Sequence, residues 1–175
     1  VDPGTNATGY ALLEWQKKSP KLLELDVLRM PRKWNHYQKL HHIFRHLNEI
    51  IQAFQPQMMA VEAPFFGKNV QAMLKLGRAQ GVAIAAGMAN GLEVTEYSPR
   101  KIKQSVTGNG NASKEQVAAM LKQMMQADFA EDWLDATDAL GAAWCHYLQF
   151  SSPIKAKKGY RDWASFLKQN PERGG

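Results

Sequence analysis

Residues 134–144, Leu-Asp-Ala-Thr-Asp-Ala-Leu-Gly-Ala-Ala-Trp, place two carboxylates at the beginning of an apolar segment. Asp135 and Asp138 are three residues apart, and side chains at that spacing lie on the same face of an α-helix. The rest of the segment is apolar, which is typical of a helix packed in a core. The segment therefore predicts a helix over 135–150 that directs both carboxylates to one side.

Two further acidic residues stand beside predicted strands. Asp2 lies in Val-Asp-Pro-Gly-Thr, and Glu62 follows the short apolar run 58–61. Each acidic residue also has an ordinary explanation, because Asp is common in turns and at helix N-caps and a Glu at a strand end is often solvated. If the fold brings Asp2 and Glu62 together with Asp135 and Asp138, the four carboxylates form a cluster of hard oxygen ligands. Such a cluster repels itself unless cations bind to it.

The composition favours one basic domain. The chain has 175 residues, a formal net charge of +6 and an isoelectric point near 9.4. Net charge alone fits an ordinary basic protein equally well. A basic protein with a separate acidic cluster favours a polyanionic partner that is handled through metal ions.

The single cysteine and the hydropathy pattern indicate a cytoplasmic protein without a membrane segment. Cys145 has no second cysteine with which to form a disulfide, which fits a reducing cytosol. No apolar run approaches the roughly 18 residues of a membrane-spanning helix. Only Val1 precedes Asp2, which is too short for a strand, so we expect that a few N-terminal residues are missing from this sequence.

Hydrophobic periodicity predicts alternating strands and helices. Strands are expected over 8–15, 22–30, 58–61 and 92–97, and helices over 37–54, 69–88, 98–106, 113–126 and 135–150. The fourth of these helices opens with Ser113-Lys-Glu-Gln116, which has capping-box spacing. This order favours an α/β domain over 1–150, with a mixed sheet and helices on both faces. Residues 151–175 are predicted to form a basic tail.

The helix over 69–88 has two contrasting faces on a helical projection. Lys68, Gln71, Lys75 and Arg78 fall within about 80° of one another at about 100° per residue. The opposite face is apolar and is expected to pack in the core; it contains Val70, Met73, Leu74, Gly77, Gly81 and Ile84. Such a face is ordinarily just solvated, but Lys68 is six residues after Glu62 and is therefore expected near the acidic site, where basic side chains would hold phosphates. A second basic group, Arg100, Lys101 and Lys103, follows a predicted strand, and Lys114 follows an Asn-rich turn.

The four carboxylates suit one kind of chemistry. Hydrolysis of a phosphodiester needs an activated water and a stabilised leaving oxygen, and two divalent ions about 4 Å apart supply both. Mg²⁺ prefers hard oxygen ligands and keeps several waters, so three or four carboxylates suffice. His42 and His46 have the spacing of a metal pair but no evident third ligand. The sequence therefore favours a magnesium-dependent phosphodiesterase.

Several motifs together resemble the RuvC family of Holliday-junction resolvases. They are Asp2-Pro-Gly-Thr, Glu62 followed by Phe65, Lys68-Asn69, Leu-Lys-Leu-Gly-Arg-Ala-Gln-Gly over 74–81, Val106 to Gly110, and Asp-Ala-Thr-Asp-Ala-Leu over 135–140. These motifs follow one another along most of the predicted domain. The runs 74–81 and 135–140 are close to diagnostic when they occur together.

The resemblance implies an RNase H-like fold with a mixed five-stranded sheet flanked by helices, and a homodimer with two active sites that depend on Mg²⁺ or Mn²⁺. It implies an endonuclease that nicks two opposed strands of a four-way DNA junction symmetrically, leaving 5′-phosphate and 3′-hydroxyl ends. It further implies a role in DNA recombination and repair, and cooperation with a RuvA–RuvB branch-migration complex.

The resemblance also assigns roles to residues. Asp2, Glu62, Asp135 and Asp138 are the implied metal-binding carboxylates, and Glu131 or Asp132 would fit the motif less well than Asp135. Lys103 and Lys114 are implied to lie near the scissile phosphate, where a cation stabilises transition-state charge. Phe65 is implied to stack on an unpaired base. The other expected DNA-binding residues are Lys68, Asn69, Lys75, Arg78, Arg100 and Lys101.

Three alternatives remain open from the sequence. A structure-specific ribonuclease on a related scaffold would use the same carboxylates. The Asp-x-Gly-Thr opening also begins actin-like and sugar-kinase ATP folds, but these need a second lobe for which 175 residues are too few. A junction-binding protein without catalysis is disfavoured because all four carboxylates are present.

Overall fold

The computed structural model describes residues 1–15, 19–64, 69–127 and 134–151. In chain order the elements are β1 (Ala7–Glu14), β2 (Lys21–Arg29), α1 (His36–Phe54), β3 (Met58–Glu62), α2 (Val70–Ala89), β4 (Glu93–Tyr97), α3 (Pro99–Thr107), α4 (Lys114–Met125) and α5 (Leu134–Ser151). Each predicted boundary lies within one residue of the observed one. The predicted order of strands and helices is therefore confirmed.

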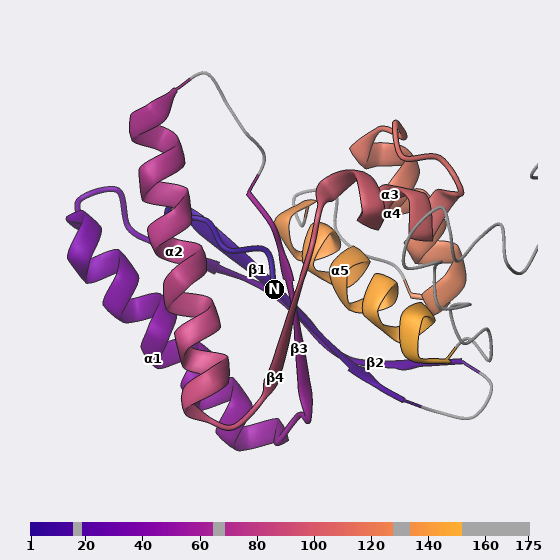
Figure 1. Ribbon diagram of the computed structural model, residues 1–175, viewed down its shortest axis with the longest axis horizontal. Helices are drawn as coiled ribbons and strands as arrows, with labels where there is room; N and C mark the ends of the chain where they lie inside the picture. The colour runs from indigo at the N-terminus through magenta and orange to yellow at the C-terminus, as the bar shows by residue number, and fades with distance from the viewer. Residues whose placement is uncertain (16–18, 65–68, 128–133, 152–175) are drawn as a thin grey trace, which may run out of the picture.

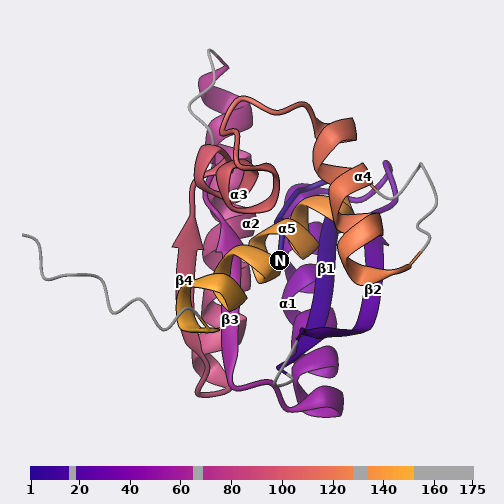
Figure 2. The same cartoon turned by 90° about the vertical axis from the view of Figure 1, so that its right-hand side faces the viewer.

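The elements form three layers, with helices on both sides of the strands. Helices α1 and α2 lie side by side on one face, and α3, α4 and α5 lie on the other (Figures 1 and 2). Helix α5 crosses the strands and packs against both β1 and β3. The predicted α/β class with helices on both faces is confirmed.

Two pairs of strands are joined through the first two residues of the chain. Strand β1 pairs antiparallel with β2, and β3 pairs parallel with β4. Val1 N donates to Ala60 O at 2.7 Å, and Glu62 N donates back to Val1 O at 3.0 Å. Asp2 and Gly9 exchange backbone hydrogen bonds of 2.9 and 3.0 Å. These bonds link the antiparallel pair to the parallel pair and bring Asp2 next to the end of β3.

The predicted count of five strands is not confirmed. The described residues contain four strands, and between β1 and β3 only Val1 and Asp2 are in place. A cavity of about 440 Å³ is lined by Val1, by β1 from Tyr10 onward, by Met58 to Ala60 of β3, and by residues of α1 and α5. The fifth strand therefore stays a prediction.

Local capping interactions fix where the helices begin. Asn35 and Gln38 form a capping box at the start of α1, and Ser113 and Gln116 form the predicted one at the start of α4. Helix α3 begins at Pro99, behind the Ser98 cap, directly after β4. The caps of α3 and α4 set the positions of the lysines that these helices carry.

The core consists of small and branched residues on both faces of the strands. On the α5 side, Ala136, Leu140 and Leu121 are fully buried. On the other side, Ile43 and Leu47 of α1 pack against alanines of α2. Burial of one Leu or Ile side chain contributes about 1.5–3 kcal/mol. Cys145 is also fully buried.

The predicted inward face of α2 was wrong for Val70, Leu74, Gly77 and Gly81, whereas Ile84 is partly buried and packs against the core as predicted. Val70 and Leu74 are 67% and 52% exposed, and a Cβ added at Gly77 or Gly81 would meet no atom within 4 Å. The buried residues of the helix include Ala79, Ala83 and Ala86. Small side chains allow α2 to pack closely on α1, and the larger residues Val70, Leu74 and Met88 are exposed.

Candidate active site

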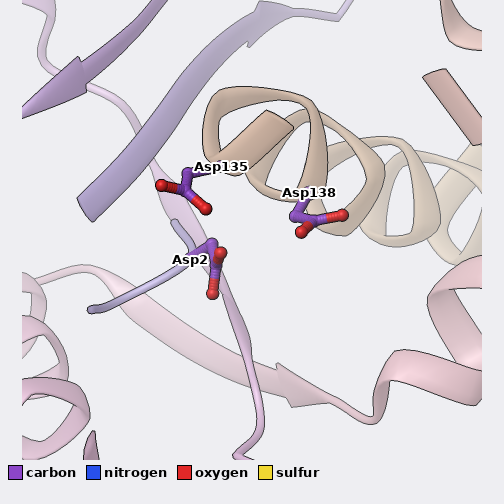
Figure 3. A group of neighbouring side chains, drawn as sticks. All are labelled: Asp2, Asp135 and Asp138. Atoms are coloured by element: carbon purple, nitrogen blue, oxygen red, sulfur yellow. The ribbon is translucent and has the colours of Figure 1, made fainter. Parts of the chain in front are cut away.

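Three aspartates from distant parts of the sequence converge at one end of the sheet. Carboxylate oxygens of Asp2, Asp135 and Asp138 lie within 4.8 Å of one another (Figure 3). Asp2 comes from the bridge beside β1, and the other two come from the first turns of α5. All three side chains are partly buried. The predicted convergence of these aspartates is therefore observed.

Gly9 allows α5 to approach the strand that holds Asp2. A Cβ at Gly9 would lie 2.8 Å from Ala136 N and closer still to the carbonyl of Asp135. The same glycine is the hydrogen-bonded partner of Asp2. Gly9 thus brings the backbones of Asp2 and Asp135 together, because a larger residue would push the helix away.

A buried threonine holds the turn that follows Asp2. The side chain of Thr8 is fully buried, and its Oγ1 donates to Gly4 O at 2.8 Å. Gly4 N donates back to Thr8 Oγ1 at 3.3 Å. A Cβ at Gly4 would overlap the carbonyl oxygen of Ala7, so the tight turn requires glycine there. The Pro-Gly-Thr segment therefore fixes the direction in which Asp2 leaves the sheet.

Glu62 lies beside the three aspartates at the end of β3. Its carboxylate is outside the group whose oxygens lie within 4.8 Å of one another. Burial, with the negative charges of Asp2 and Asp138, raises the pKa of Glu62 to about 8. The fourth predicted carboxylate is therefore close enough to interact electrostatically with the others.

The acidic cluster opposes its own ionisation. Burial, with the charges of Asp138 and Asp135, raises the pKa of Asp2 to about 6. Burial is also the largest cause of the raised pKa of Asp138. A divalent cation would relieve this repulsion. The set of hard oxygen donors at Asp2, Asp135 and Asp138, with Glu62 alongside, therefore fits Mg²⁺ or a similar ion.

Two predicted lysines border the cluster. Lys114 Nζ donates to Asp138 Oδ2. Burial lowers the pKa of Lys114, but the hydrogen bond and the charges of Asp138, Asp2 and Glu62 outweigh burial and raise it. The positive charge of Lys103 on α3 acts on Asp138 and lowers the pKa of that carboxyl, in opposition to burial. Both lysines thus supply positive charge at the site.

The predicted DNA-binding residues are spread over α2 and α3. Asn69 is the N-cap of α2, where its side chain accepts from Ala72 N at 3.0 Å. Lys75 and Arg78 are exposed on α2, and Arg100 and Lys101 are exposed on α3. Phe65 and Lys68 lie outside the described residues, as do Glu131 and Asp132.

Thr8 and Gly9 are two positioning residues of the site that sequence reasoning missed. Gly9 interrupts a predicted strand, and an isolated glycine in a strand often marks a close approach of another backbone. That signal was available in the sequence, although it did not identify Asp135 as the neighbour. For Thr8, no local signal distinguished a buried hydroxyl from an ordinary strand threonine.

Fold and site together define a class of protein. Aspartates converge from a sheet strand and a crossing helix beside two lysines, which is the arrangement of a metal-dependent nuclease with an RNase H-like fold. The family model described as "Crossover junction endodeoxyribonuclease RuvC" matches residues 1–146. The chain belongs to the RuvC family of crossover junction endodeoxyribonucleases.

Individual relatives agree with this assignment. The chain is 49% identical over 177 residues to RuvC of Bacteroides fragilis, a match that covers 99% of this chain and 93% of the relative. It is 50% identical over 173 residues to RuvC of Cytophaga hutchinsonii, covering 99% and 85%. The structure of Thermus thermophilus RuvC in complex with Holliday junction substrate has a TM-score of 0.79 and 27% identity, covering 86% of this chain and 92% of that one. The predicted family and fold are confirmed.

Among the described residues, no helix combines the length and the apolar character needed to cross a bilayer.

Proposed function

We propose that this protein resolves four-way (Holliday) DNA junctions by two symmetric nicks, in DNA recombination and repair. The carrying observation is the group of three aspartates beside Lys114, in a chain of the RuvC family. The Thermus thermophilus relative has been solved with a Holliday junction substrate, which supports the same substrate class here. Hydrolysis would leave a 5′-phosphate and a 3′-hydroxyl.

Asp2, Asp135 and Asp138 would hold the divalent ions, with Glu62 completing the set of ligands. Mg²⁺ is the proposed ion and Mn²⁺ the alternative, because both accept hard oxygen ligands. Two bound ions would lower the pKa of a water and stabilise the leaving oxygen. Asp2 is the proposed shared ligand, since it lies between the end of β3 and the start of α5.

Lys114 and Lys103 would bind the non-bridging oxygens of the scissile phosphate. Lys114 contacts Asp138, so its ammonium already stands at the edge of the acidic cluster. A fixed positive charge there stabilises the negative charge that develops during displacement. A charge-reversing Lys103→Glu substitution is therefore expected to weaken cleavage.

The remaining predicted contacts would position the DNA. Asn69, Lys75, Arg78, Arg100 and Lys101 are exposed polar or basic residues on the helices that flank the site. They would contact backbone phosphates, which fix register and orientation. Phe65 and Lys68 stay predictions from the family motif. Residues 1–150 would form the nuclease domain and 151–175 a basic tail.

The exposed apolar stripe of α2 is the proposed dimer interface. Val70, Leu74, Gly77, Gly81 and Met88 follow one another along one side of the helix. The glycines would let a second α2 approach closely, and the larger residues would bury apolar surface. A twofold axis at this helix would present two active sites to two strands of like polarity. A RuvA–RuvB complex is the proposed partner of the dimer.

The test is cleavage of a synthetic four-way junction labelled on each strand in turn. Reactions contain Mg²⁺, Mn²⁺ or EDTA, with duplex DNA and an RNA junction as control substrates. We expect paired nicks at symmetric positions in the DNA junction alone, and products that a ligase rejoins. Asp2→Asn should abolish the nicks, whereas Glu49→Gln, which removes an acidic residue paired with Arg45 on α1, should not. RNA cleavage, or junction binding without nicks in either metal, would overturn the proposal.

A further inference from the structure

Two long stretches of the sequence contain no acidic residue. Between Asp26 and Glu49 the chain has five basic residues, and between Glu62 and Glu93 it has three. These eight positive charges exceed the net charge of +6 for the whole protein. The first stretch forms the end of β2, the following turn and most of α1, and the second includes α2. Helices α1 and α2 lie side by side, so the two stretches reinforce each other (Figure 1).

A cluster of positive charges surrounds the start of α1. The pKa of His36 is lowered by burial and, in addition, by the positive charges of Arg78, Lys75 and Lys39. Arg78 and Lys75 belong to α2, whereas Lys39 is one turn into α1. The basic face of α2 therefore continues onto the neighbouring helix.

Asn6 connects this cluster to the active site. Lys39 Nζ donates to Asn6 Oδ1 at 3.1 Å, and Met30 N donates to Asn6 O at 2.9 Å. Asn6 lies in the turn that follows Asp2 and is itself exposed. Arg32 and Lys33 are exposed in the turn between β2 and α1. The turn that begins at Asp2 is thus tied to the start of α1 by the Lys39–Asn6 hydrogen bond.

We propose that Lys39, with Arg32 and Lys33, binds backbone phosphates of a junction arm, beyond the step that is cleaved. This surface extends the predicted contacts of Lys75 and Arg78 onto a second helix. It rests on the proposed junction substrate. An ordinary solvated surface would mix charges of both signs, whereas these two neighbouring segments have only positive ones. A duplex arm, with one phosphate charge per about 1.7 Å, is the polyanion that such a line of charges fits.

The test is junction binding as a function of salt, measured by fluorescence anisotropy in EDTA so that no strand is cut. Each phosphate contact contributes about 0.9 to the slope of log affinity against log salt. Lys39→Gln should reduce the slope by about one contact and weaken binding several-fold, and an Arg32→Gln/Lys33→Gln double variant should reduce it by about two. Arg45→Gln is the matched control, because Arg45 is on the same helix but pairs with Glu49 at 3.3 Å.

The outcomes separate a phosphate contact from a structural role. Asn6→Ala removes the partner of Lys39 and keeps the charge, so it should leave the slope unchanged. If Lys39→Gln keeps the wild-type slope, or Arg45→Gln reduces it equally, the inference is wrong. If the proposed function itself is wrong, the wild-type protein will bind junction and duplex DNA equally and, in the cleavage assay with Mg²⁺ or Mn²⁺, will cut neither. If the wild-type protein cleaves the junction normally but Lys39→Gln leaves the slope of log affinity against log salt unchanged, only the proposed phosphate contacts of α1 are wrong.

Discussion

The two helical layers of this protein differ in how they use charge. In the α3–α5 layer, Asp135 and Asp138 of α5 and Lys114 of α4 converge on Asp2, and their positions are set by close backbone contact. In the α1–α2 layer, charged and apolar side chains are spread along exposed helix faces, with Lys75 and Leu74 both exposed to solvent. A chemical step needs atoms held within a fraction of an ångström, whereas a binding surface needs area and charge.

This difference predicts which property of the protein, catalysis or association, a given substitution will change. A change in the acidic cluster on the α3–α5 side is expected to affect the chemical step and the affinity for metal, with DNA binding retained. A change in the α1–α2 layer is expected to affect association with DNA or with a second copy, with the metal site retained.

The largest expected effect belongs to Asp2→Asn. Loss of a proposed shared metal ligand should reduce the cleavage rate by more than about 100-fold, since even outer residues of metal sites cost about 10–100-fold. The same change removes one charge from a self-repelling cluster, so the melting temperature in EDTA should stay the same or rise. Single-turnover cleavage and thermal melting measure the two effects. A variant that melts earlier in EDTA, or cleaves at the normal rate, contradicts this account of the site.

Gly9→Ala should have the next largest effect. The added methyl group would overlap the backbone of Asp135 and move the start of α5 away from Asp2. Overpacking of this kind costs about 1–3 kcal/mol of folding free energy. We expect a lower melting temperature, a smaller gain in melting temperature on adding Mg²⁺, and slower cleavage. Junction binding in EDTA should persist, because the α1–α2 surface is untouched; an unchanged response to Mg²⁺ would show that Gly9 does not position the aspartates.

Gly9 and α2 also mark the limits of what the sequence could predict. Local patterns predicted the strands and helices because capping boxes, Gly-Asn turns and apolar periodicity act over a few residues. The partner of Gly9 is near the other end of the chain, so no local pattern specifies it. On α2 the helical projection assigned the larger apolar residues to the core, whereas Ala79, Ala83 and Ala86 pack there because α1 lies close. The choice between those two faces depends on a neighbouring helix.

Leu74→Glu tests the α1–α2 layer. Leu74 is 52% exposed in the apolar stripe, and a charge there would be buried without a partner in a dimer. We expect a monomer by analytical ultracentrifugation and loss of paired nicks. The gain in melting temperature on adding Mg²⁺ should remain, since each acidic cluster belongs to one chain. Gln52→Glu is the matched control, because it adds the same charge at an exposed position on the neighbouring helix α1, outside both the stripe and the basic face of α2. A Leu74→Glu protein that stays dimeric would remove this stripe from the interface.

The smallest expected effect is a dependence of metal-free stability on pH. The pKa of Asp2 is raised to about 6 and that of Glu62 to about 8, from ordinary values of about 4 in an unfolded chain. Between about pH 4 and pH 8 these two carboxyl groups therefore bind more protons in the folded protein than in the unfolded one, so their contribution to the free energy of unfolding falls as pH rises. A divalent ion competes with these protons, so the gain in melting temperature on adding Mg²⁺ should grow over the same range. Glu62→Gln should flatten the change between about pH 6 and pH 8, whereas Glu49→Gln on α1 should leave it intact. A gain that is constant with pH would mean that the acidic cluster is already ionised without metal, and the contrast between the two layers would then rest on geometry alone.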